Sequence, residues 1–184
     1  NFGQDPTFAG NESGGGSEFL YTQPTDGSGN EFLALSTANL PTPTIADGTV
    51  HFDTFLYTGN DTDSTDVGSL NFQPDLVWVK NRDAALSHVL IDSVRGAESN
   101  DYLELYSDSS VYEANFDDRI SAINSNGIEV NYDGTAMVNA AGNDYAAWNW
   151  KAGTTGSTST TSGGPGAGWA ESFNATAGFS IVKW

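Results

Sequence analysis

The chain has 184 residues, and its 24 acidic and 6 basic side chains give a formal net charge of −18. This acidity excludes the basic footprint that nucleic-acid binding needs, and it disfavours docking on anionic lipid. The sequence contains no cysteine, which removes disulfides, thiolate catalysis and zinc–cysteine sites. We therefore expect neither nucleic acid nor a membrane as a partner.

The first fifty residues predict two unlike segments. Residues 1–37 are rich in glycine, with short apolar patches between turn residues, and indicate an irregular segment that contains some β-structure. Residues 38–50 include Pro41 and Pro43, a spacing that favours an extended connector. We place a domain boundary in this connector.

Residues 51–153 show the alternation of β-strands. Leu76–Lys80 and His88–Ser93 are joined by a short polar stretch, which predicts an antiparallel hairpin. The alternation places Val77, Val79, Val89 and Ile91 on one buried face of this hairpin, with Trp78 on the opposite face.

Further strands follow at the spacing of a sandwich. The expected strands are Phe52–Tyr57, Tyr102–Tyr106, a weaker Val111–Phe116, Arg119–Asn124, Gly127–Tyr132 and Tyr145–Lys151. Asn126-Gly127 is suited to a type I′ turn between two of them. Seven to eight short strands without an amphipathic helix predict an all-β fold, an antiparallel β-sandwich with irregular glycine-rich flanks.

The C-terminal residues suggest a linker and a repeat. Residues 154–170 are mostly Gly, Ser and Thr, and this composition indicates a linker. Phe179–Trp184 (FSIVKW) echoes the aromatic spacing of Phe52–Tyr57 (FDTFLY). We therefore assign residues 171–184 to the start of a second module, in which Trp184 ends a strand, and expect the sequence to be part of a longer tandem chain.

One loop has the composition of a cation site. Asp61, Asp63 and Asp66 lie in the stretch NDTDSTDVG and could offer oxygen ligands to calcium, the one cofactor that we consider. The spacing departs from that of an EF-hand, and an ordinary solvated loop is the alternative.

Nothing in the sequence assembles a catalytic constellation, and we expect no enzyme activity. His51 and His88 are too isolated for a metal cluster and are expected to be structural. Asp117, Asp118, Glu104 and Glu113 could be imagined as paired carboxylates of a glycosidase, but no pattern singles them out.

Two further residues carry expectations. Trp169 lies in glycine-rich sequence and is the best candidate for an exposed platform that stacks on a ligand. Arg95 is one of only 6 basic residues, and we expect its guanidinium to hold a carboxylate, with Asp92 or Asp75 as the leading candidates.

Several stretches together resemble a known repeat module. WVKNR (78–82), HVLIDSVRGA (88–97) and YAAWNWKAG (145–153) are similar to a module of tail-fibre and virion-surface proteins of tailed bacteriophages, above all those that infect aquatic bacteria. NFGQDPTFAG and FLALSTANLPTPTI, near the N-terminus, resemble segments upstream of that module, where they end a lectin-like, SPRY-type sandwich. The resemblance covers roughly residues 1–39 and 51–153.

The resemblance implies a structural role and no catalytic activity. It implies a lectin-like or jelly-roll-like sandwich in a structural component of a phage virion surface appendage, a tail fibre or capsid fibre, as a spacer or host-contact module. The expected partners are other virion proteins, further copies of the chain and a host surface glycan, and the expected location is the virion surface or the extracellular space. The alternative is a carbohydrate-binding adhesin module of a viral or bacterial surface filament.

Overall fold

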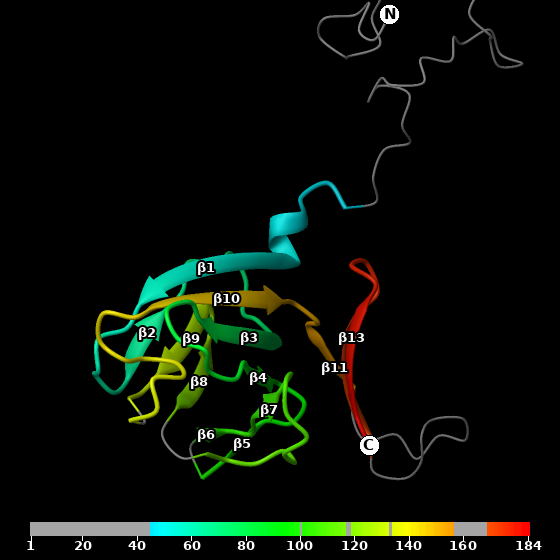
Figure 1. The fold of residues 1–184 in the computed structure, drawn as a ribbon. Coiled ribbons are helices and arrows are strands. Elements are labelled where there is room, and N and C mark those ends of the chain that lie inside the picture. The colour runs from blue at the N-terminus through cyan, green and yellow to red at the C-terminus, as the bar shows by residue number, and fades with distance from the viewer. Residues whose placement is uncertain (1–44, 100, 117–118, 133, 157–168) are drawn as a thin grey trace, which may run out of the picture. The chain divides into compact units, whose positions relative to one another are not determined.

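The computed structural model describes residues 45–99, 101–116, 119–132, 134–156 and 169–184 (Figure 1). Residues Asp47–Trp184 group as one compact unit. The described residues contain no helix long and apolar enough to cross a bilayer. The expectations for residues 1–37 and for most of the 38–50 connector lie outside this description.

The described elements are strands, preceded by one turn of 3-10 helix. They are η2 (Gly48–Val50), β1 (Phe52–Thr58), β2 (Thr65–Val67), β3 (Leu76–Asn81), β4 (Val89–Asp92), β5 (Ala97–Glu98), β6 (Asp101–Tyr102), β7 (Leu105–Tyr106), β8 (Ile120–Asn124), β9 (Gly127–Val130), β10 (Asp144–Trp150), β11 (Thr154–Gly156), β12 (Ala170–Asn174) and β13 (Phe179–Lys183). The predicted all-β class is confirmed.

The largest sheet has five antiparallel strands in the order β1-β10-β3-β4-β7. Its hairpin is the predicted one: Val77 lies opposite Ile91, and Val79 lies opposite Val89. All four side chains are fully buried, whereas Trp78 is half-buried on the other face. The predicted division between the two faces is therefore confirmed.

A smaller sheet, β2-β9-β8, forms the second layer. Ile120, Ile128 and Val130 join the valines and isoleucine of β3 and β4 in one hydrophobic core. Because two antiparallel sheets enclose this core, the described part of the chain is a β-sandwich.

The turn between β8 and β9 differs from the predicted one. Asn124 lies opposite Gly127, so Ser125 and Asn126 form the two-residue turn, and neither has the positive φ of a type I′ turn. Gly127 instead begins β9, where a Cβ would collide with the carbonyl of Val67. The glycine is required by close packing of β9 on β2.

The predicted strand Tyr102–Tyr106 is two strands instead of one. β6 and β7 belong to different sheets, and Glu104 between them is buried and pairs with the buried Arg119. A charged side chain that must reach an internal partner interrupts the pairing. The weaker predicted strand Val111–Phe116 is reduced to a single bridge between Glu104 and Ala114.

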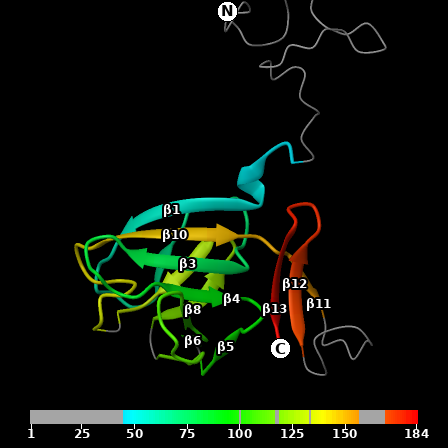
Figure 2. The same ribbon diagram turned by 45° about the vertical axis from the view of Figure 1, so that its right-hand side comes forward.

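The C-terminal hairpin packs against the sandwich. β11, inside the predicted linker, pairs with β12, which pairs with β13. The ring of Phe179 stacks on Trp150 of β10 at 6.2 Å, and Asn174 Nδ2 lies 2.9 Å from Nδ1 of His51. Figure 2 shows β13 on the side of β12 that faces the large sheet. The hairpin thus contacts the sandwich through β10 and His51, and the assignment of residues 171–184 to a second module stays a prediction.

The core predicts how two apolar substitutions differ. Ile91→Ala deletes a fully buried side chain of β4 and should lower the free energy of unfolding by about 2–5 kcal/mol. Leu56→Ala, at a side chain that is 64% exposed, should change it by no more than about 0.5 kcal/mol. Urea unfolding measures both, and equal losses would contradict the assigned faces.

Candidate functional site

The three aspartates of the predicted cation loop do not converge. Asp61 Oδ1 accepts a hydrogen bond from the amide of Ala141 at 2.6 Å, and Asp63 Oδ1 accepts one from the amide of Tyr132 at 3.0 Å. Asp66 accepts a hydrogen bond from the Asn124 side chain. Among the described residues no group of three acidic or histidine side chains could hold a metal ion. Each carboxylate fastens the loop to a different segment.

Two buried asparagines form hydrogen bonds with the backbone of the same loop. Asn139 Oδ1 accepts a hydrogen bond from the amide of Asn60 at 3.1 Å, and its Nδ2 donates one to the Thr62 carbonyl at 2.8 Å. Asn131 Oδ1 accepts a hydrogen bond from the amide of Ser64 at 2.6 Å. Asn131 and Asn139 are both buried. Side-chain amides here supply the bonds that a strand partner would otherwise supply.

A second loop, between β9 and β10, is held by the core. The rings of Tyr57 and Tyr145 stack at 4.9 Å, and their hydroxyls donate to the carbonyls of Val138 and Ala136 at 2.7 and 3.0 Å. The fully buried Asn81 also donates to the Ala136 carbonyl, at 2.7 Å. Both loops at this end of the sandwich are thus fixed by buried hydrogen bonds.

The backbone of these loops is strained. Asp61, Ser64 and Ala136 have φ values of 56°, 54° and 60°, a left-handed region that residues other than glycine rarely occupy. Such conformations persist only where surrounding contacts over-determine them. The hydrogen bonds that Asn131, Asn139 and the two tyrosines form with the loop backbone are such contacts.

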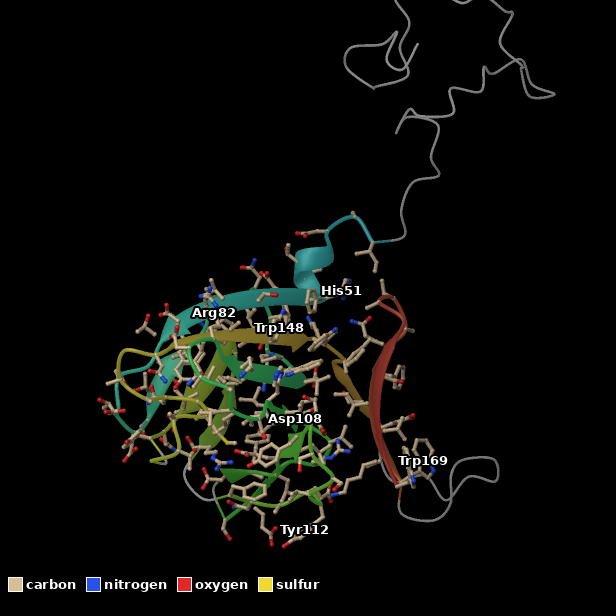
Figure 3. All side chains as sticks on the ribbon, viewed as in Figure 1. His51, Arg82, Asp108, Tyr112, Trp148 and Trp169 are labelled. Atoms are coloured by element: carbon tan, nitrogen blue, oxygen red, sulfur yellow. The ribbon has the colours of Figure 1, made fainter. Side chains whose placement is uncertain are left out.

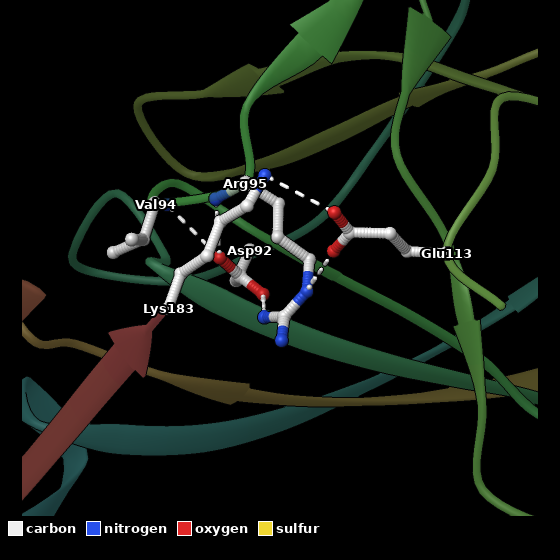
Figure 4. Close-up of polar contacts among 5 residues, drawn as sticks. All are labelled: Asp92, Val94, Arg95, Glu113 and Lys183. Carbon is white, nitrogen blue, oxygen red and sulfur yellow. Dashed lines mark hydrogen bonds and ion pairs between the residues drawn. The ribbon is translucent and has the colours of Figure 1, made fainter. Parts of the chain in front are cut away.

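A cluster of charges joins the sandwich to the C-terminal hairpin (Figure 4). Arg95 pairs with Asp92, which confirms the predicted carboxylate partner, and its Nε lies 3.0 Å from Glu113 Oε2. Lys183 of β13 pairs with Glu113 Oε1 at 3.2 Å. Asp92 Oδ1 also accepts hydrogen bonds from the amides of Val94 and Arg95. Glu113 is therefore held between two cations.

Glu104 occupies a different environment. Its Oε2 lies 2.9 Å from Arg119 Nη1, and the two side chains are 2% and 8% exposed. Arg119 also donates to the Tyr106 hydroxyl and lies over the Phe116 ring, 5.3 Å from its centroid. Of the four carboxylates that could be imagined as a glycosidase pair, Glu104 and Glu113 are each paired with an arginine, and Asp117 and Asp118 lie outside the described residues.

The histidines and Trp169 have packing roles. His88 Nδ1 accepts the indole N–H of Trp78 at 2.9 Å, and His51 lies against Asn174 of the hairpin. Trp169 is half-buried, beside the hairpin in Figure 3, and its indole nitrogen is buried without a hydrogen-bond partner among the described residues. The role of Trp169 as a platform that stacks on a ligand stays a prediction.

The outward face of the large sheet carries the aromatic side chains instead. The pairing register places Thr54, Trp148, Trp78 and Leu90 in one row across four strands, and we call this row the aromatic floor. The rings of Trp78 and Trp148 meet edge to face at 5.9 Å. Both tryptophans are half-buried. The floor as a surface was not expected, since the register that builds it comes from pairing between distant segments.

Burial of Tyr57 predicts a loss of stability in alkali. Burial, and secondly the neighbouring Tyr145, raise the pKa of Tyr57 well above 10.0. Below pH ~10 the phenol is neutral in both states. As the pH rises further, the unfolded chain loses this proton while the folded chain keeps it, so the free energy of unfolding falls. Urea unfolding from pH 9 to 11 should show a shallower fall in Tyr57→Phe, and an unchanged slope would contradict the role of burial.

The two kinds of ion pair predict different losses. Glu104→Gln leaves Arg119 buried without its counter-charge and should cost about 3–5 kcal/mol. Lys183→Gln breaks a pair whose side chains are both 36% exposed and should cost less than about 1 kcal/mol. Urea unfolding at low and high salt measures both, with a salt-dependent loss only for Lys183→Gln. Equal losses in the two variants would show that burial does not set the strength of these pairs.

Comparison with known proteins gives one match. No curated protein and no solved structure matches the chain. Residues 47–184 match the model of a family described as a domain of unknown function, DUF7483. The match includes the sandwich, the C-terminal hairpin and the residues that connect them. The chain belongs to the DUF7483 family.

Proposed function

We propose that the chain is a structural module of a phage virion surface appendage, a tail fibre or capsid fibre, and acts there as a rigid spacer or host-contact unit. The observation that supports the proposal is that buried polar side chains form hydrogen bonds to the backbone of loops. Asn81, Asn139 and Tyr145, which are buried, all bond the backbone of loops. A spacer that holds neighbouring parts of an appendage at a fixed distance needs rigid loops.

The charged residues support the same proposal. The carboxylates of Glu104 and Glu113 are neutralised by cations of the same chain. The remaining acidic surface keeps a protein that is displayed at high local concentration soluble, because like charges repel. Other virion proteins and further copies of the chain are the proposed partners, and the virion surface is the proposed location. Binding of a host glycan stays a prediction.

Immunogold electron microscopy tests the proposal directly. Antibodies raised against the whole chain and applied to purified particles of the source phage should label appendages that project from the particle. Particles whose proteins are extracted with denaturant should contain the chain by mass spectrometry. Purified particles that lack the chain, from a lysate that contains it, would contradict a virion location.

A further inference from the structure

The side-chain amide of Asn174 is fixed in one orientation where the C-terminal hairpin meets the sandwich. Its Oδ1 accepts a hydrogen bond from the amide of Ala177 at 3.0 Å, and its Nδ2 donates one to the Lys151 carbonyl at 3.2 Å. A backbone N–H can only donate and a carbonyl can only accept, so exchanging the two ends of the side-chain amide would break both bonds. The atom of Asn174 that faces His51 is therefore the nitrogen, which is a donor.

This orientation determines which form of His51 fits the docked hairpin. Asn174 Nδ2 lies 2.9 Å from His51 Nδ1, and a hydrogen bond between the two atoms requires Nδ1 to accept. A neutral imidazole with its hydrogen on Nε2 offers that lone pair, whereas the imidazolium carries hydrogen on both ring nitrogens. Protonation of His51 therefore sets an N–H of the ring against the N–H groups of Asn174.

The backbone keeps the ring of His51 beside the hairpin. The N–H of His51 donates to the Gly48 carbonyl at 3.0 Å, and its carbonyl accepts a hydrogen bond from the amide of Lys151 at 2.8 Å. The side chain is half-buried. Turning the protonated ring over would replace Nδ1 by a carbon, which also loses the hydrogen bond from Asn174. Either response to the proton weakens the contact.

The charged groups around His51 belong to the sandwich side of the contact. Asp47, which precedes η2, is exposed and interacts electrostatically with His51, and Lys151 follows β10. Asp53, two residues along β1, accepts a hydrogen bond at Oδ1 from the amide of the next residue. The side chain that the hairpin presents to the ring, Asn174, is uncharged. A positive ring is thus drawn toward Asp47 and gains no counter-charge from Asn174.

We propose that protonation of His51 weakens the docking of the C-terminal hairpin on the sandwich, so that the hairpin opens more often in acid. Histidine is the side chain that ordinarily gains its charge between about pH 8 and pH 5. Docking is strongest with His51 neutral and weakens as the pH falls through this range. Opening separates Phe179 from Trp150, whose rings now stack. This acid response goes beyond the proposed spacer role.

Amide hydrogen exchange of the whole chain at about pH 7.5 and about pH 5 tests the proposal. Each rate is divided by that of an unstructured amide at the same pH, which removes the direct effect of pH on exchange. Protection of the amides in β12 and β13 should fall about fivefold or more in acid, the factor that corresponds to one lost hydrogen bond. So small a sheet is marginal without its packing. The amides of β3 and β10 should keep their protection.

A matched pair of variants assigns the response to one histidine. His51→Asn places an acceptor oxygen near the position of Nδ1 and has no proton to gain, so the protection of β12 and β13 should not fall in acid. His88→Asn is the same change at the other histidine of the chain, whose Nδ1 accepts the indole N–H of Trp78. This variant should keep the full response of the hairpin.

A third variant should reverse the sign of the response. Asn174→Asp keeps an oxygen for the amide of Ala177 and gives protonated His51 an acceptor of opposite charge. Protection of β12 and β13 should then rise as the pH falls. Repulsion between the new carboxylate and the Lys151 carbonyl is present at both pH values, so it does not change this direction. A contact that served packing alone would show no reversal.

The proposal fails on any of three results. The first is equal protection of β12 and β13 at the two pH values in the unaltered chain, a result that does not depend on how any variant folds. The second is the same acid loss in His51→Asn, which would assign the response to the other ionic contact of the hairpin, between Lys183 and Glu113. The third is a matching loss in β3 and β10, which would show unfolding of the whole sandwich.

Discussion

The alternation of side chains along β10 is the constraint on which the rest of the structure depends. Tyr145, Ala147 and Asn149 point into the core and are fully buried, while Trp148 and Trp150 point outward. β10 lies between β1 and β3, so its register fixes theirs. A slip by one residue would drive two indoles into a core that has space for alanine, and the pairing is therefore specified strongly.

The inward residues of β10 also fix the conformation of the loops at one end of the sandwich. Tyr145 stacks on Tyr57 and accepts a hydrogen bond from the amide of Ala140 at 2.9 Å. From there the contacts pass to Asn139 and to the loop after β1. Buried polar groups that are satisfied in this way rigidify a structure, because breaking one leaves a costly unpaired group. Of the outward residues of the same strand, Trp148 is part of the aromatic floor and Trp150 stacks on Phe179.

Much of this architecture is predictable from the sequence, for a physical reason. The faces of β3 and β4 follow from alternation, which is a local property of the chain. The partner of Arg95 follows from the scarcity of basic residues and from Asp92 being three residues away. Asn81 continues the inward series of Val77 and Val79, so its burial could also have been found by extending that series.

Other features depend on contacts that local pattern does not contain. Glu104 lies in an alternating run, and only its distant partner Arg119 explains why β6 and β7 are separate. β11 consists of Thr154–Gly156 in a low-complexity stretch, and it is a strand because β12 pairs with it. Asp61, Asp63 and Asp66 have the composition of a cation loop, but each is directed to a different backbone or side-chain donor.

The central claim is that buried side chains make the loops as rigid as the sheets, and amide hydrogen exchange of the chain measures this most directly. The amides of Asn60, Ser64 and Ala140 donate to Asn139, Asn131 and Tyr145 respectively. These three loop amides should exchange as slowly as amides in the centre of β10, through opening of the whole fold. Exchange of the three at the rate of an exposed loop, while β10 stays protected, would contradict the account.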